Sequence, residues 1–385
     1  MKENAQSLAL VDTYNDILSL SASESDMKRE NANINTNSPM GMMLKIGTES
    51  MKKYIDEVVL PKELSVPEKE GYVHYHDKDF SLITFNCCQI DLKAILAKGF
   101  HTGHGFVRSP QSIRSAATLS CIIIQSNQND MFGGQSLLGY DSALADYVKK
   151  SFYKNIISHS YNALCYTHSI NSFMSLKEFS TAMKNELDKD KIFYTEKDKD
   201  KNKKLISYKE ISRSISKVLE NYIFSQLSVN VINIYTLACD DVEDETHQAM
   251  EAAVHNFCTL QSRAGSQTPF SSVNFGMDTS PEGRLVSKEL LNAIDEGLGH
   301  GETVIFPISI FTIKSGINYN PEDPNYDLFI RACEVSAKRL YPNFTSQDAS
   351  FNLPYYKEDD YRTVISVMGW RKPKPILVNH LTSGC

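Results

Sequence analysis

The chain has 385 residues, of which 41% are hydrophobic, enough for a large buried core. Its formal net charge of −7 excludes a general electrostatic attraction to nucleic acid or to an anionic membrane surface. No stretch approaches the roughly 20 consecutive apolar residues of a membrane span, and the first residues lack the pattern of a signal peptide. We therefore expect a cytoplasmic protein.

The first 37 residues are polar and rich in Asn and Ser, which predicts a frayed leader. From Pro39 to Leu60 apolar residues recur with a period near 3.6, which indicates an amphipathic helix that ends before Pro61. From Gly71 the sequence GYVHYHDKDFSLITFNCCQIDL is strand-like and places His74 and His76 on one face.

Residues 111–165 are rich in small residues and helical in character, with an interruption at Gly133-Gly134. The Lys/Asp-rich run at 185–204 predicts a solvated insertion or loop.

The second half alternates between helix-like and strand-like segments. The expected elements are a helix at 246–265, a strand at 270–275, a helix ending near Gly297, a doubly buried strand in the apolar run 303–311, a helix at 326–340 and a strand at 363–369. Such alternation predicts an α/β protein with a parallel sheet.

None of the eight cysteines forms a C-x-x-C pair, so their spacing favours neither a zinc ribbon nor a thioredoxin-like dithiol. Cys87 and Cys88 would point to opposite faces of a strand, which disfavours a disulfide between them. We expect free thiols in a reducing compartment, most of them small core residues, with one available for chemistry.

Three segments carry residues capable of chemistry. His74, His76 and Asp77 could hold a divalent metal, although structural histidines are the commoner outcome for such a triplet. Cys87 follows Asn86 on an apolar strand, where a buried structural cysteine is the default. The glycines of HTGHG (101–105), with Gly133-Gly134, would let the backbone approach a ligand, but glycine turns are common.

Taken together and in order, several segments resemble the anaerobic (class III) ribonucleoside-triphosphate reductases. They are ENANINTNSPMGMMLK (30–45), HYHDKDF (74–80), NCCQIDL (86–92), GFHTGHG (99–105), QSNQNDMFGGQS (125–136), RAGSQTPFSSVNFG (263–276), NPEDPNYDL (320–328) and KRLYPNF (338–344). The resemblance runs from about residue 28 to residue 369.

This resemblance implies an α/β fold that forms the first half of a ten-stranded α/β barrel of the ribonucleotide reductase and glycyl-radical enzyme type. It implies anaerobic reduction of ribonucleoside triphosphates for DNA synthesis. A glycyl radical, installed by a radical-SAM activating enzyme, oxidises a finger-loop cysteine. The resulting thiyl radical takes the 3′ hydrogen of the ribose, and formate is the usual reductant.

Carried over by position, Cys87 matches the hydrogen-donating cysteine of the first barrel strand and Asn86 its neighbour in the substrate pocket. His74 and His76 match histidines beside that pocket, which favours substrate or formate handling and predicts no metal site. On this reading Cys87 faces the nucleotide and Cys88 turns outward. The family's homodimer surface and its deoxynucleotide and ATP effector sites would fall roughly within residues 105–170.

The sequence departs from the family at Met368-Gly369-Trp370-Arg371, where a tryptophan stands at the position of the thiyl cysteine. No match to the radical glycine or the four-cysteine zinc site follows. We therefore expect a polar leader at 1–28, a reductase catalytic domain at 29–369 with the first half-barrel and the effector helices, and an unrelated tail at 370–385. A frameshift, intron read-through or a split gene would account for that tail.

The leading hypothesis is thus an incomplete reductase that is inactive alone. One alternative is a catalytically inactive effector-binding subunit that assembles with a separately encoded C-terminal half. The other is a metal-dependent hydrolase that uses His74, His76 and Asp77.

Overall fold

The computed structural model describes residues 11, 14–15, 38–83, 87–172, 174–187, 192–196, 199–220, 229–263, 267–355 and 357. Most of the predicted leader, Asn86, the strand expected at 363–369, Trp370 and the predicted tail lie outside the described residues.

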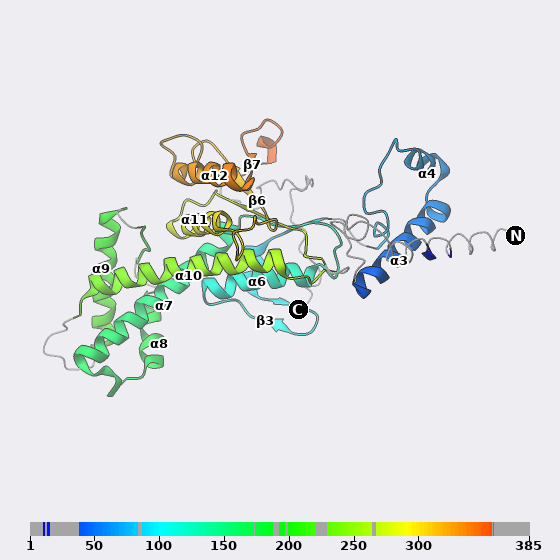
Figure 1. The fold of residues 1–385 in the computed structure, drawn as a ribbon. Helices are drawn as coiled ribbons and strands as arrows, with labels where there is room; N and C mark the ends of the chain where they lie inside the picture. The colour runs from blue at the N-terminus through cyan, green and yellow to red at the C-terminus, as the bar shows by residue number, and fades with distance from the viewer. Residues whose placement is uncertain are drawn as a thin grey trace.

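The amphipathic helix predicted from Pro39 is confirmed as α3 (Pro39–Tyr54), which continues into one π-helical stretch, η1 (Ile55–Val59). Ser38 caps it, because its Oγ accepts a hydrogen bond from the backbone N–H of Gly41 at 3.0 Å. A short helix, α4 (Lys62–Lys69), follows. In Figure 1 α3 and α4 stand apart from the rest of the molecule.

A five-stranded parallel sheet forms the centre of the remaining chain, as the alternation of elements predicted. Its strands, in spatial order, are β1 (Cys88–Ile90), β4 (Gln135–Leu137), β5 (Ser271–Phe275), β6 (Ile308–Ile313) and β7 (Asn343–Ser346). The larger helices between them are α6 (Ile113–Asn127), α7 (Tyr140–His168), α10 (Val231–Thr259), α11 (Pro281–Glu296) and α12 (Tyr326–Arg339).

Shorter elements complete the described part. They are α5 (Leu92–Lys98), the hairpin of β2 (Phe100–His101) and β3 (Phe106–Val107), η2 (Ile170–Ser172), α8 (Leu176–Leu187), α9 (Lys201–Val218) and η3 (Leu353–Tyr355). Figure 1 shows α7 and α10 running alongside each other away from the sheet, with α8 and α9 at their far ends. No helix among the described residues has the length and apolar character needed to cross a membrane.

The two faces of the sheet differ in chemistry. Leu137 and Val273 are register partners, so they point to the same face, and both belong to the buried core that the helices share. The opposite face carries small polar side chains. Ser136 and Ser272 are also register partners there, and the Ser136 hydroxyl donates to Oδ1 of Asn274 at 3.1 Å. One face of the sheet is thus a conventional apolar core, while the other is polar in β4 and β5 and gains the buried Ile310 from β6.

Several predicted boundaries are wrong. Among the described residues of the strand expected from Gly71, only Cys88–Ile90 form a strand, and residues 76–83 form turns. The helix expected from residue 246 begins fifteen residues earlier, at Val231. Within the apolar run 303–311 the strand begins only at Ile308. Strands β4 and β7 were not expected, because three or four residues carry too little periodicity to be recognised.

The prediction that the Lys/Asp-rich run is a solvated insertion is also wrong for its middle part. Ile192 and Tyr194 are buried, and the Tyr194 hydroxyl donates to the Glu243 carboxylate on α10 at 2.9 Å. Glu196 accepts from Nε of Arg284 on α11 at 2.7 Å. Ile192, Tyr194 and Glu196 therefore anchor this segment to the helices. The surrounding lysines and aspartates are what suggested a solvated loop.

Arg284 is the centre of a buried ion-pair cluster between α11, α12 and the 192–196 segment. Its guanidinium also donates to the Asp327 carboxylate, at 2.6 Å, and to the carbonyl of Pro324. These acidic partners raise the pKa of Arg284 against the opposing effect of burial. Losing the guanidinium would leave the half-buried Glu196 with only the exposed Lys199 as an ion-pair partner, which is costly.

We predict that Arg284→Gln lowers the free energy of unfolding by about 3 kcal/mol. The matched control is Arg331→Gln, which removes a more exposed pair with Asp295 between the same two helices and should cost less than about 1 kcal/mol. Urea unfolding followed by circular dichroism measures both. Equal losses from the two variants would contradict the structural role of Arg284.

Candidate functional site

Cys87 lies immediately before β1, is half-buried, and borders a pocket of about 220 Å³. The residues that line this pocket are His76, Asp77, Cys87, Gly133, Gly134, Arg263 and Phe270. We call it the Cys87 pocket. Two of the predicted site residues, Cys87 and His76, are thus brought together by the fold.

The sheet itself explains why these residues meet. Cys87, Gly134 and Phe270 each directly precede a strand, and those strands, β1, β4 and β5, are neighbours. The parallel ladder extends into this edge: the backbone N–H of Cys88 donates to the carbonyl of Gly134 at 3.0 Å, and that of Gln135 to the carbonyl of Phe270 at 2.8 Å. The Cys87 pocket therefore sits at the amino ends of the strands.

The adjacent cysteines have different surroundings. Burial, together with the negative charge of Asp77, raises the pKa of the Cys87 thiol, although a hydrogen bond from the Gly134 backbone partly opposes this. Cys88 was expected to turn outward, but it points into the core. Asn127 donates to its sulfur at 3.2 Å, and burial raises its pKa to about 12. Both groups are protonated thiols at neutral pH.

The predicted strand geometry of the histidines is wrong, but the rings still lie near each other. His74 and His76 are both exposed, and their ring centroids are 5.7 Å apart in an edge-on arrangement. His76 lies at the rim of the Cys87 pocket, with Nε2 3.5 Å from Oδ2 of Asp77. His74 is not among the lining residues, nor are His101 and His104, which belong to the β2–β3 hairpin.

Arg263 and Phe270 are the pocket residues that were not singled out from the sequence, and Arg263 is the charged one. It lies in the segment RAGSQTPFSSVNFG and is only 5% exposed. Its guanidinium carbon lies 4.2 Å from the ring centroid of Phe132 and 4.1 Å from that of Phe270, and Nη2 donates to the Phe132 carbonyl at 2.8 Å. Burial lowers its pKa to about 10, so it stays charged at neutral pH. The one sequence feature that could have indicated Arg263 is its place a few residues before Phe270, which directly precedes the predicted strand.

A metal site from His74, His76 and Asp77 would need these groups to converge. Among the described residues, no cluster of three or more His, Cys, Asp or Glu side chains is arranged to hold a metal ion. The exposed His74 lies outside the pocket where His76 and Asp77 meet.

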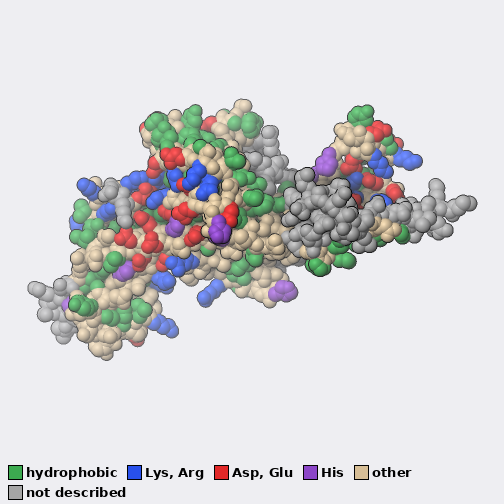
Figure 2. Space-filling model, viewed as in Figure 1, with side chains coloured by type: hydrophobic (Ala, Val, Ile, Leu, Met, Phe, Trp, Pro, Cys, Tyr) green, Lys and Arg blue, Asp and Glu red, His purple; other side chains and the backbone are tan. Residues whose placement is uncertain are grey.

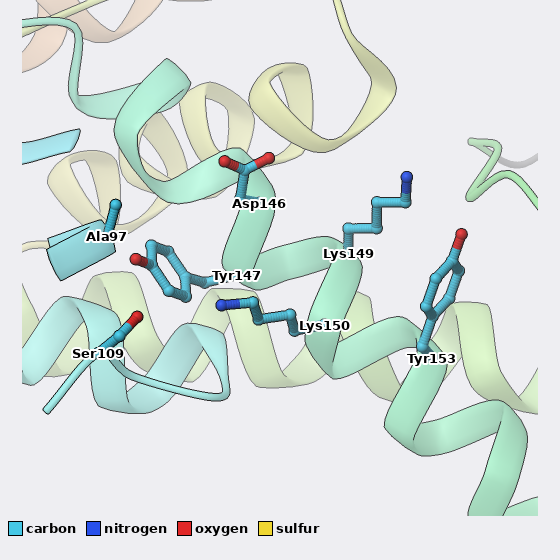
Figure 3. Close-up of a pocket in the computed structure, with 7 residues that line it drawn as sticks. All are labelled: Ala97, Ser109, Asp146, Tyr147, Lys149, Lys150 and Tyr153. Atoms are coloured by element: carbon cyan, nitrogen blue, oxygen red, sulfur yellow. The ribbon is translucent and has the colours of Figure 1, made fainter. Parts of the chain in front are cut away.

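A second pocket, of about 390 Å³, lies along α7 (Figure 3). Its lining residues are Ala97, Ser109, Asp146, Tyr147, Lys149, Lys150 and Tyr153. Lys150 lies over the Tyr147 ring, with Nζ 4.6 Å from the centroid, and also donates to the Pro110 carbonyl at 3.4 Å. Nζ of Lys149 lies 5.5 Å from the centroid of Tyr153. We call this the α7 pocket.

A sequence model of the anaerobic ribonucleoside-triphosphate reductases matches residues 30–372, most of the chain. The chain belongs to this family. The anaerobic ribonucleoside-triphosphate reductase of Haemophilus influenzae is 27% identical over 300 residues, which are 77% of this chain and 33% of that protein. That of Enterobacteria phage T4 is 27% identical over 325 residues, which are 83% of this chain and 42% of that protein.

A solved structure described as an anaerobic ribonucleotide reductase has a TM-score of 0.52 at 11% identity and covers 91% of this chain and 46% of its own. The family and the α/β, barrel-type fold predicted from the sequence are therefore confirmed. The chain spans less than half the length of these relatives. A metal-dependent hydrolase is not favoured, because the reductase match includes the His74–Asp77 segment.

The raised pKa of Cys87 predicts how its reactivity depends on pH. Only the thiolate is alkylated, so the rate with iodoacetamide should reach half of its maximum at a higher pH than for glutathione. Peptide mass spectrometry after timed alkylation measures Cys87 separately from the other cysteines. Cys88, whose thiol is buried, should remain unlabelled throughout. A midpoint for Cys87 below that of glutathione would contradict this assignment.

Proposed function

We propose that this chain provides the first half-barrel of a reductase that converts ribonucleoside triphosphates to deoxyribonucleoside triphosphates by radical chemistry, with Cys87 as a hydrogen donor. The observation that carries the proposal is a half-buried, protonated thiol in a pocket at the edge of the sheet. A thiol can give a hydrogen atom only while its S–H bond is intact. The environment that raises the pKa of Cys87 therefore suits hydrogen-atom donation better than nucleophilic attack.

The glycyl radical of the family would supply the initial oxidation, through a finger-loop cysteine, with a radical-SAM enzyme as the activating partner. The described residues have a different task in this proposal: they hold the ribose near Cys87 and keep water away from it. Formate remains the proposed reductant. The protein would work in the cytoplasm, where its substrates are found.

His76 and Asn86 keep proposed roles beside the substrate. His76 stands at the rim of the Cys87 pocket and pairs with Asp77, so it can donate a hydrogen bond toward a ligand that enters there. Asn86 directly precedes Cys87 in the chain. His74 is proposed only as a neighbour of His76, since its ring lies outside the lining.

The test is a chimera in which residues 1–369 are followed by the C-terminal part of the phage T4 relative, activated and assayed without oxygen. Cys87→Ser should abolish deoxynucleotide formation, because a hydroxyl O–H is too strong a bond to replace a thiol S–H. Cys88→Ala, which keeps an apolar side chain in the core, should retain most of the activity. An equal loss of activity in both variants would indicate structural damage and would contradict the assignment of Cys87.

We also propose that the α7 pocket binds the phosphates of a nucleotide effector and that the chain forms a homodimer around this region. Most of the lining lies within the predicted effector region, and it includes two lysines and two tyrosines against a single acidic residue, Asp146. Lys149 and Lys150 supply positive charge, and the aromatic rings offer faces on which a nucleobase can stack. This observation also supports the alternative of a catalytically inactive effector-binding subunit, which would keep the α7 pocket without turnover.

Deoxynucleoside triphosphates should accordingly raise the Tm of the chain as their concentration increases, because a ligand that binds only the folded state stabilises it. Lys149→Gln combined with Lys150→Gln should remove most of this rise. Lys154→Gln is the matched control, since Lys154 is exposed on the same helix and does not line the pocket. Differential scanning fluorimetry measures all three proteins. An equal response of the double variant and the control would contradict the proposed effector site.

A further inference from the structure

The guanidinium of Arg263 is almost fully buried and only partly satisfied. Its Nη2 donates to the Phe132 carbonyl, but Nε and Nη1 have no hydrogen-bond partner in the described part of the chain. A buried charge without hydrogen bonds is costly, so such a group calls for an anionic partner. Asp77 also lines the pocket, and its negative charge acts on Arg263 to raise its pKa against burial, but no hydrogen bond or ion pair joins the two side chains in the described part of the chain.

The rings of Phe132 and Phe270 hold the guanidinium between them, at 4.2 and 4.1 Å. This stacking restricts the orientation of the guanidinium plane, so its remaining N–H groups keep fixed directions. A planar, pre-oriented set of donors matches the planar oxygen pair of a carboxylate.

The size and charge of the Cys87 pocket select among anions. Its volume of about 220 Å³ is too small for a whole nucleoside triphosphate, whose phosphates would lie outside it, but is ample for a few heavy atoms beside the ribose. Arg263 and Asp77 supply opposite charges to the same pocket, and a polyanion would be repelled by Asp77. A single negative charge on a small ligand fits this balance best.

We propose that Arg263 is the recognition residue for a small monocarboxylate bound next to Cys87. The proposal deepens the proposed function by naming the residue that recognises its carboxylate reductant, and it rests on that function only in taking Cys87 as the reacting thiol. Arg263 positions the ligand and takes no part in bond making. A reductant of the size of formate, held here, would lie beside the thiol that it must regenerate.

Iodoacetate is itself a small monocarboxylate that alkylates thiols, and iodoacetamide is its neutral analogue. The ratio of their rates at Cys87, relative to the ratio for glutathione, therefore reports the Arg263 site without requiring turnover. We expect this ratio to fall at least about fivefold in Arg263→Gln. The ratio should be unchanged in Arg114→Gln, which removes an exposed arginine from α6. Arg263→Lys, which keeps the charge but not the planar donors, should fall between them.

Competition between added anions and iodoacetate in the unaltered protein shows which kind of anion the pocket binds. Acetate or formate should protect Cys87 from iodoacetate, and this protection should be lost in Arg263→Gln. Protection by tripolyphosphate alone would overturn the proposal, because the pocket would then hold the phosphates of a nucleotide. A ratio at Cys87 equal to that of glutathione would overturn it as well.

Labelling of the buried Cys121 would reveal an unfolded Arg263→Gln protein. Arg263→Lys and the competition experiment would then decide the question. Inactivity of the chimera with intact carboxylate protection would count against the proposed reductase, not against the Arg263 site.

Discussion

The hydrogen-bonded parallel ladder between β1, β4 and β5 is the constraint on which the candidate site depends. It holds three segments that are far apart in the sequence at one edge, so that Cys87, Gly134 and Phe270 stand beside one another. Phe270 in turn provides one of the two rings that hold Arg263. A shift of register by one residue would exchange Cys87 for Cys88 at the pocket, because alternate residues of a strand face opposite sides. Register therefore decides which thiol is available.

The opposite end of the sheet is closed by buried polar side chains. The Asp141 carboxylate accepts hydrogen bonds from the backbone N–H groups of Gly276 and Asp278, at 2.8 and 3.0 Å, and burial raises its pKa to about 6. Asn318 and Asn325 both donate to the Gly276 carbonyl. Ligands of open α/β sheets usually bind beyond the carboxyl ends of the strands. Here that end of β5 is filled by protein groups, which fits the placement of the Cys87 pocket at the amino ends.

The sequence allowed the parallel sheet, the helix after Ser38 and the pairing of Cys87 with a pocket to be predicted, because each depends on local periodicity or on a family resemblance. It misled where tertiary contacts outweigh local pattern. His74 and His76 alternate as strand residues do, but no strand in the described part of the chain pairs with them, and they lie in an exposed, irregular segment. Tyr194 lies among lysines and aspartates, but its hydroxyl finds Glu243 from a distant helix. The burial of Arg263 could not be predicted from its neighbours in the sequence, because it depends on two rings contributed by separate segments.

The charge states of Cys87 and Arg263 both depend on burial and on Asp77, which lines the same pocket. A thiolate at Cys87 would add a second negative charge to the pocket and would compete with an anionic ligand for the guanidinium. Burial and Asp77 instead raise the pKa of the thiol, while the guanidinium, with a pKa lowered only to about 10, remains charged. Near neutral pH the pocket therefore contains a neutral hydrogen donor and a guanidinium whose Nε and Nη1 have no hydrogen-bond partner in the described part of the chain. The same burial that keeps the S–H bond intact thus leaves the positive charge of Arg263 available to a ligand.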